Sequence, residues 1–487
     1  MMQQAKTAWE RALESAIQSA RKLCDVTVCR DVALALIAYK LLSDVHAAHL
    51  KRDWTFPLML NRASDGFLTT DDLSQTLQEV SHAIPQVEDI FADMTERLSA
   101  LAVSEDKRED VLKILFEAIA PFDFAKIDPA ERGAAYARQI EKLAKCRKAP
   151  LSVTPAAVSE LIAAIVTHGK RDTEAVSIYD PTLGSASLLL KTGACFPDTT
   201  AVNYYGQEND QHTLCIARWN CLLHGIAPEA AHLTEGDTLA EDWFSHATLD
   251  LAYDIMVMQP PYGARWAAEQ YLLYDPRFAA VGVLPPRTHA DNAFLLHGLY
   301  QLKEDGIMAI ILPHGVLFRG GPDGKIRQYL IENGLIAAVI GLPANLFYDS
   351  KIPCALLILQ KHRPSKDILV IDASKEYAQD GRQNILTPQN TQRIVQAYLR
   401  REDEPHFCHL ATIEEIRTND YNLNIPRYVD TFEPEPECDF PALTKEMATR
   451  RQQIVANKNE LLRAMQQLTP SDEDTMRMIQ VFQKIIK

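Results

Sequence analysis

Four consecutive residues near the middle of the chain have the types and order that could hold an amino group: Gln259, Pro260, Pro261 and Tyr262. They follow an apolar run at 253–258, which predicts a buried parallel strand, and so stand at its carboxyl end, where open α/β sheets bind ligands. Proline fixes φ and removes a backbone donor, which leaves carbonyl oxygens free to accept hydrogen bonds. An amide oxygen and such a carbonyl can hold a planar –NH2 group, while the Tyr262 ring stacks on its heterocycle. The pattern favours methyl transfer to an amino group on a base; the alternative is a Pro-Pro loop that only closes a strand.

A turn of small residues follows the first predicted strand, at 176–180, and precedes an apolar helical run at 188–190. Small residues at a strand-to-helix turn let backbone N–H groups approach a ligand closely. The candidate cofactor-binding residues of this turn are Asp180, Pro181, Gly184, Ser185, Ala186 and Ser187.

Acidic residues follow the next two predicted strands. Glu208 lies 24 residues beyond Gly184, which suits a carboxylate that binds ribose hydroxyls. Asp237 follows the third segment and could bond an adenine amino group. The first turn lacks the G-x-G-x-x-G pattern, so a dehydrogenase is weakly supported. Each turn alone could be a structural loop, but four in this order on consecutive strands indicate one ligand site.

The motifs that carry a family resemblance are "DPTLGSASLLL", "YGQENDQHTLCIARWNCLLHG", "GDTL" and "DIMVMQPPY", followed by "DNAFLLHGLYQLKEDGIMAIILPHGVLFRGG", "IGLPANLFYDSKIPCALLILQKHR" and "NDYNLNIPRYVD". In this order they resemble the modification (methylation) subunit of type I restriction-modification systems, which are DNA adenine N6-methyltransferases. The similarity covers roughly 151–430, so it is more specific than a shared fold.

The resemblance implies a class I S-adenosylmethionine-dependent methyltransferase fold, a Rossmann-like doubly wound α/β sheet, with S-adenosylmethionine as cofactor. It also implies double-stranded DNA as substrate, with the target adenine flipped out of the duplex. Gln259 and the Pro260 carbonyl would then accept the two N6 hydrogens. In the family a separate specificity subunit reads the DNA sequence and two modification subunits flank it; whether a restriction subunit joins is left open.

Further cofactor residues come from the resemblance alone. Family members carry an aromatic-Thr-Pro sequence that lines the cofactor pocket, which assigns Leu151, Val153, Thr154 and Pro155, with Val153 in place of the aromatic residue. Local chemistry alone predicts that Thr154 caps a helix that Pro155 begins.

Gln259 departs from the family, which normally has Asn at this position. Glutamine keeps the acceptor oxygen but adds a methylene, and a misplacement of about 1 Å can cost on the order of 10²-fold in rate. We therefore carry three hypotheses: an active DNA adenine methyltransferase, a catalytically weak or silent scaffold that binds cofactor and partners, and a methyltransferase for a protein glutamine or another amino substrate.

Composition narrows the class of protein. The 487 residues carry 47% hydrophobic and 24% charged residues, as ordinary soluble proteins do, and no apolar signal or membrane span is evident. Nine cysteines without a C-x-x-C pair favour reduced thiols in the cytoplasm and no metal site. The net charge of −15 is unusual for a protein that grips DNA alone, and fits a partner that supplies most of the grip.

We expect three parts. Residues 1–148 show helical spacing and predict an N-terminal helical domain, 149–429 the methyltransferase domain, and 430–487 an acidic, proline-rich linker followed by partner-binding helices. At least seven strands are expected, and capping is the default role of Asp291, which opens a predicted helix. The segment "RGGPDGKI" has the wrong spacing for a phosphate-binding loop, which excludes nucleotide triphosphate hydrolysis.

Overall fold

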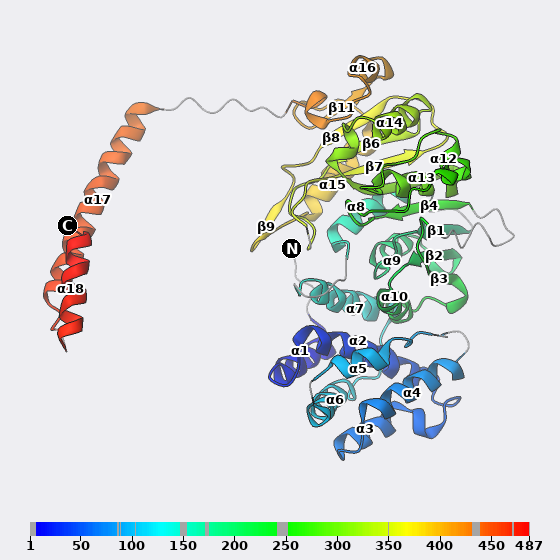
Figure 1. Cartoon of the computed structure of the whole chain (residues 1–487), viewed down its shortest axis with the longest axis horizontal. Coiled ribbons are helices and arrows are strands. Elements are labelled where there is room, and N and C mark those ends of the chain that lie inside the picture. Colours follow the sequence, from blue (N-terminus) through cyan, green and yellow to red (C-terminus); the bar gives the residue numbers. More distant parts are fainter. Residues whose placement is uncertain are drawn as a thin grey trace. The chain divides into compact units, whose positions relative to one another are not determined.

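A computed structural model describes residues 6–84, 87, 89–102, 104–146, 153–170, 175–240, 252–348, 350–430, 439–469 and 472–486 (Figure 1). The chain divides into two compact units, Met1–Thr431 and Phe432–Lys487. The first holds an N-terminal group of helices and a large sheet, and the second holds two helices.

The N-terminal group consists of α1 (Ala8–Ala20), α2 (Val26–Val45), α3 (Phe56–Ser64), α4 (Thr70–Ala83), α5 (Met94–Ala100), α6 (Glu105–Ile119) and α7 (Pro129–Ala144), as the apolar spacing predicted. Short polar side chains begin several of them: Thr7 forms a capping box with Glu10 at α1, and Asp128 accepts from two backbone N–H groups at α7. The apolar helix α2 is buried along most of its length, so it forms the centre of this group.

The sheet has nine strands in the described part of the chain, ordered β11-β8-β6-β7-β5-β4-β1-β2-β3. β7 is antiparallel to β5 and to β6, β11 is antiparallel to β8, and the other pairs are parallel. The bounds are β1 (Val176–Asp180), β2 (Val202–Glu208), β3 (Ala231–Glu235), β4 (Tyr253–Met258), β5 (Leu302–Pro313), β6 (Ile336–Gly341), β7 (Cys354–Gln360), β8 (Ile368–Asp372) and β11 (Cys408–Ala411). A separate hairpin pairs β9 (Ala378–Asp380) with β10 (Gln383–Ile385).

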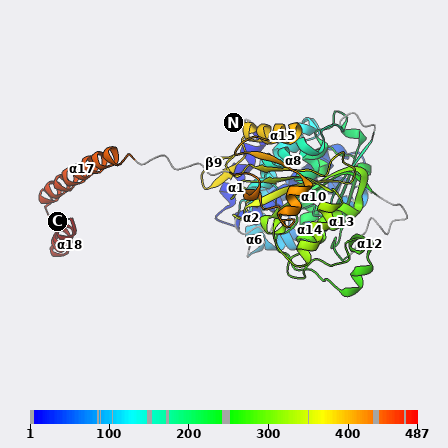
Figure 2. The ribbon, with the colours of Figure 1, turned by 90° about the horizontal axis from the view of Figure 1, so that it is seen from above.

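Helices cover both faces of the sheet, which confirms the doubly wound α/β architecture. Figure 2 shows α8 (Ala156–Val166) and α15 (Pro388–Arg400) on one side, and α13 (Asp291–Gln301) and α14 (Pro322–Glu332) on the other. Residues alternate between the two cores, since Ile255 and Val257 of β4 face the first group while Met256 and Met258 face the second. The shorter helices are α9 (Ser187–Gly193), α12 (Pro276–Ala279) and α16 (Ile413–Thr418).

The helix α10 (Gln211–Leu223) joins the N-terminal helices to the sheet. Its Cys215, Ile216, Trp219 and Leu223 pack into the N-terminal core, while other residues of α10 pack on the sheet side. The Trp219 indole donates to the backbone oxygen of Ile90 at 2.7 Å. The helix α10 therefore buries residues both in the N-terminal core and in a core of the sheet.

The second unit contains α17 (Phe440–Gln466) and α18 (Glu473–Ile486), so the predicted C-terminal helices are confirmed. α17 buries none of its residues, and its Met447, Ile454 and Leu461 are exposed. Most of the predicted linker lies outside the described residues. None of the described helices combines the length and apolar character needed to cross a bilayer.

Candidate functional site

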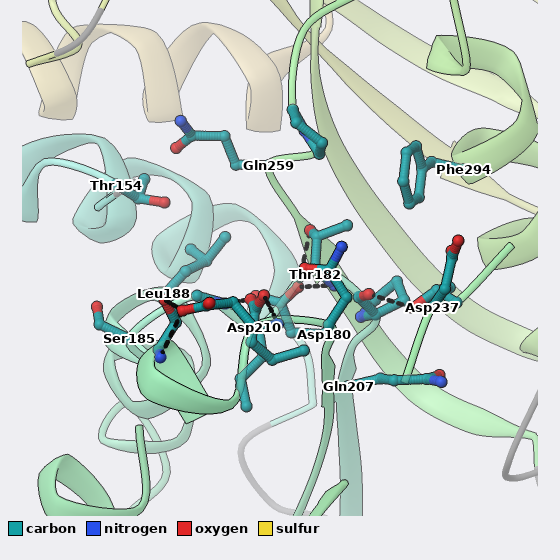
Figure 3. A pocket seen from close by; sticks show the side chains of 18 of the residues that line it. Thr154, Asp180, Thr182, Ser185, Leu188, Gln207, Asp210, Asp237, Gln259 and Phe294 are labelled. Atoms are coloured by element: carbon teal, nitrogen blue, oxygen red, sulfur yellow. Dashed lines mark hydrogen bonds between the residues drawn. The ribbon is translucent and has the colours of Figure 1, made fainter. Parts of the chain in front are cut away.

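A cavity of about 340 Å³ lies at the carboxyl ends of β1, β2, β3 and β4 (Figure 3). From β1 the sheet continues through β2 and β3 on one side, and through β4 and β5 on the other. The connections leaving adjacent strands there run in opposite directions, which opens a crevice in α/β sheets. The size is within the range of small-molecule sites.

The small-residue turn between β1 and α9 forms one wall. Gly184 and Ala186 both have left-handed backbones, with φ of 53° and 61°. Glycine adopts this conformation freely, whereas alanine is strained there by about 1–2 kcal/mol. Ala186 is fully buried, and the turn is tied internally by a hydrogen bond of 2.8 Å between the Ser185 and Ser187 hydroxyls. The chain thus keeps the tight turn with alanine at a position that suits glycine.

Two carboxylates of the cavity wall are shielded from solvent, Asp180 fully and Glu208 in part. Asp180 accepts from the Thr182 N–H at 2.9 Å, and burial, reinforced by nearby Glu208, raises the Asp180 pKa to about 7. Glu208 accepts from the backbone N–H groups of Gly184 at 2.9 Å and Asp210 at 3.0 Å, yet burial still raises its pKa. Each carboxylate keeps lone pairs for a ligand. Ionising either carboxyl without a nearby cation is costly, so a cationic ligand would be favoured.

Two further acidic side chains line the same cavity. Asp210 caps α10 by accepting from the Thr213 N–H at 2.9 Å. Asp237 accepts from the Leu239 N–H at 2.9 Å, which fixes its carboxylate at the end of β3. The described lining therefore has four carboxylates, from the ends of three strands and the start of one helix.

The predicted amino-binding segment, residues 259–262, forms a lip directly after β4. Figure 3 shows Gln259 at the upper edge of the cavity, with its amide on the side where Thr154 lies and Phe294 on the other side. The Gln259 Oε1 is buried without a hydrogen-bond partner among the described residues. Leaving a buried acceptor without a hydrogen bond lowers the stability by about 1–3 kcal/mol. This oxygen therefore suits a ligand that donates an N–H. Pro260 is buried, and the Tyr262 ring packs edge-on against Phe347 at 6.0 Å between centroids.

The structure brings ten of the sixteen predicted site residues into the cavity lining: Thr154, Asp180, Pro181, Gly184, Ser185, Ser187, Glu208, Asp237, Gln259 and Pro261. Five others do not line it: Val153, Pro155, Ala186, Pro260 and Tyr262. Val153 is buried in the N-terminal core. Leu151 lies outside the described residues.

Two local capping predictions are wrong. Thr154 does not cap α8: Pro155 is itself the N-cap residue, and the Ala156 N–H donates to Glu141 Oε1 of α7 at 3.1 Å. Asp291 does not cap α13 either. Glu141 thus takes the bond expected of Thr154, while the Asp291 carboxylate bonds Gly263 and Arg319, which are distant in sequence.

Ten lining residues were not predicted: Thr182, Leu183, Leu188, Gln207, Asn209, Asp210, Thr213, Gly236, Thr238 and Phe294. Seven of them adjoin a predicted residue, and Asp210 and Thr213 follow Glu208 by two and five residues, so the rule that ligands bind at strand ends could have found these nine. Phe294 comes from α13, and the sequence held no local signal for it.

The site therefore joins an acidic cavity at three strand ends to an amide lip. The cavity suits a positively charged ligand of nucleoside type, and the lip suits a planar amino group. An apolar ring, Phe294, stands beside both. The arrangement can hold a small electrophile next to a hydrogen-bonded amine.

Comparison with known proteins matches residues 133–437 to the family described as N-6 DNA Methylase. The MpnII type I restriction enzyme methylase subunit of Mycoplasma pneumoniae is 36% identical over 299 residues, which are 60% of this chain and 55% of the relative. A solved type I restriction-modification methyltransferase subunit from Streptococcus thermophilus is 35% identical, with a TM-score of 0.81, and covers 87% of this chain and 99% of that one.

A structure from work on assembly and conformational transition of the type I system shares the fold at 16% identity, with a TM-score of 0.68 over 96% of this chain and 100% of that one. This chain spans 55% of the length of the curated M. pneumoniae relative. The expected methyltransferase fold is confirmed by the S. thermophilus structure. Since the family match covers well over half of the residues, the chain belongs to the N-6 DNA methylase family.

Proposed function

We propose that this chain is the methylating subunit of a type I restriction-modification system and transfers a methyl group from S-adenosylmethionine to adenine N6 in DNA. The observation that carries the proposal is the buried, unpaired Oε1 of Gln259 at the rim of an acidic cavity, in a chain of the N-6 DNA methylase family. A specificity subunit would choose the target sequence.

The residues of the cavity fit the cofactor. Burial raises the pKa of both Asp180 and Glu208, so a sulfonium cation would offset the cost of ionising them. Asp237 and Glu208 carry acceptors for amino and hydroxyl groups of a nucleoside. Held by these carboxylates, S-adenosylmethionine would supply the methyl group, with S-adenosylhomocysteine as the leaving group and the N6 proton released to solvent.

The lip residues act on the adenine. Because N6 cannot be reached in the base stack, the adenine leaves the duplex and enters the site. The Gln259 oxygen and the Pro260 carbonyl accept the two N6 hydrogens, which favours a pyramidal nitrogen with a localised lone pair. The Tyr262 ring stacks on the purine. Positioning and electrostatics supply most of the rate, without a covalent enzyme intermediate.

The net charge of the chain and the exposed apolar residues of its C-terminal helices support binding to partner subunits. With a net charge of −15, the chain lacks the excess of basic residues that lone DNA binders use. The exposed apolar residues of α17 and α18 provide a surface for a specificity subunit. In the proposed complex two copies of this chain flank that subunit in the cytoplasm.

The test is transfer of labelled methyl groups to duplex DNA by the full chain co-purified with its specificity subunit. Digested DNA is separated into nucleosides, and label is expected in N6-methyldeoxyadenosine. Label in a cytosine derivative would contradict the proposed lip chemistry. Cofactor binding and assembly without any label would favour the silent scaffold, and label on a peptide but not on DNA would favour an amino substrate in proteins.

A further inference from the structure

The loop at 318–321, between the 3-10 helix η6 (His314–Leu317) and α14, is tied to the lip by a buried carboxylate. Asp291 is 1% exposed and accepts from two groups. Its Oδ1 accepts from the Gly263 N–H at 3.4 Å, one residue after the lip, and its Oδ2 accepts from Arg319 Nη1 at 2.8 Å. Asp291 thus places an arginine next to the residue that follows Tyr262.

Hydrogen bonds from Arg327 and within the segment fix the backbone of this loop. Arg327 Nη1 donates to the backbone oxygens of Val316 at 3.0 Å and Arg319 at 2.9 Å. The Arg319 N–H donates to the Gly315 oxygen at 2.9 Å. These bonds fix the backbone of the arginine, so its side chain is presented from a rigid base.

The guanidinium of Arg319 is held in place and remains accessible to solvent. It lies over Gly315, where an added Cβ would stand 2.5 Å from Arg319 Nε. The side chain remains 33% exposed. A guanidinium has five N–H donors, and Asp291 takes one of them among the described contacts. Donors are therefore left for an acceptor that arrives from solvent.

The two residues after Arg319 leave room for such an acceptor. A Cβ built at Gly320 or Gly321 meets no atom within 4 Å. Gly321 has φ of +65°, which favours glycine by conformation, whereas Gly320 is not among the residues with positive φ. The fold therefore does not require glycine at position 320, and the missing side chain keeps the surface beside Arg319 open.

We propose that Arg319 and the open glycines 320 and 321 grip a DNA backbone phosphate next to the flipped adenine. The inference rests on the proposed function and names the residue that positions its substrate. Arginine matches the planar, bidentate geometry of phosphate, and phosphate contacts fix the register of a protein on DNA without reading sequence. That role suits a chain that leaves sequence recognition to another subunit.

The experiment measures DNA binding and methylation by the full chain with its specificity subunit, for wild type, Arg319→Gln and Arg400→Gln. Arg400 is exposed at the end of α15 and serves as the charge-matched control. We expect Arg319→Gln to weaken DNA binding roughly tenfold, equally for different sequences, and to reduce the slope of log affinity against log salt by about 0.9, since one phosphate contact is lost. Affinity for S-adenosylmethionine should not change.

Gly320→Val tests the open surface without altering charge. We expect it to fold and bind cofactor as wild type does, and to weaken DNA binding severalfold. Arg319→Lys keeps the charge and should recover part of the salt slope, which a purely structural role of the Arg319–Asp291 pair would not predict.

A wild-type complex that methylates DNA, with Arg319→Gln and Gly320→Val both matching Arg400→Gln, would overturn the phosphate grip alone. A wild type that neither binds nor methylates DNA would overturn the proposed function, and this inference with it.

Discussion

Replacing Asp180 by Asn should stabilise the cofactor-free protein against unfolding and weaken its affinity for a cationic cofactor. Asn keeps the Oδ1 that accepts from the Thr182 N–H and hydroxyl, so the turn is retained. It removes only a buried negative charge. The two effects have opposite signs, which makes the substitution informative.

The magnitude follows from the pKa of Asp180, about 7 in the folded protein against an ordinary 3.8. Because the folded pKa is raised, the folded state holds an extra proton between roughly pH 4 and 7. The contribution of Asp180 to the free energy of unfolding is most favourable below its ordinary pKa of 3.8, which applies to the unfolded chain. This contribution falls as pH rises to the folded pKa of about 7. At 1.36 kcal/mol per pH unit, the loss is on the order of 4 kcal/mol at pH 8.

The assay is urea unfolding of the cofactor-free protein from pH 5 to pH 8, for wild type, Asp180→Asn and the exposed control Glu229→Gln. We expect the stability of wild type and the control to fall with pH and that of Asp180→Asn to fall less, with contributions such as those of Glu208 and His212 left. Calorimetry at pH 8 should show at least a roughly tenfold loss of S-adenosylmethionine affinity in Asp180→Asn, because a charge pair at a partly buried site amounts to a few kcal/mol. The neutral product S-adenosylhomocysteine should lose less. Parallel pH profiles for all three proteins, with unchanged affinities, would refute the reasoning.

Two more predictions concern the elements that hold the cavity. His212 of α10 bonds Asp93 at 2.6 Å and Asp31 at 3.0 Å, and although burial opposes its charge these partners raise the His212 pKa to about 9. Its stabilisation, up to about 3 kcal/mol, is present below pH 6.5 and lost as pH rises through 9, so urea unfolding of His212→Gln should show a flatter pH dependence than wild type over this window. In Gly206→Ala the new Cβ would stand 2.6 Å from Leu183, a cavity residue, so we expect a loss of about 1–3 kcal/mol by urea unfolding and weaker cofactor binding by calorimetry; wild-type affinity would contradict the packing argument.

Much of the fold could be predicted because the strands and helices have clear apolar periods. The strand ends carry Gly184, Glu208, Asp237 and Gln259, and the parallel pairing of β1, β2, β3 and β4 brings these ends to one edge. Local pattern and global fold agree at these positions.

The remainder depends on contacts between distant residues. Glu141 takes the bond that Thr154 was expected to make, and Asp291 bonds Arg319 instead of capping its own helix. The antiparallel direction of β7 has no signal in its apolar composition, since buried strands look alike in either direction. Phe294 reaches the cavity because α13 packs against β5.

The central claim is that the Gln259 oxygen holds the amino group that is methylated. The direct measurement is the initial rate of label transfer from S-adenosylmethionine to adenine N6, for wild type, Gln259→Asn and Gln259→Leu, with cofactor affinity measured in parallel. We predict transfer by wild type and by Gln259→Asn, and a rate lower by on the order of 10²-fold or more in Gln259→Leu at unchanged cofactor affinity. Transfer by Gln259→Leu at the wild-type rate, or no transfer by either amide-bearing protein despite cofactor binding and assembly, would contradict it.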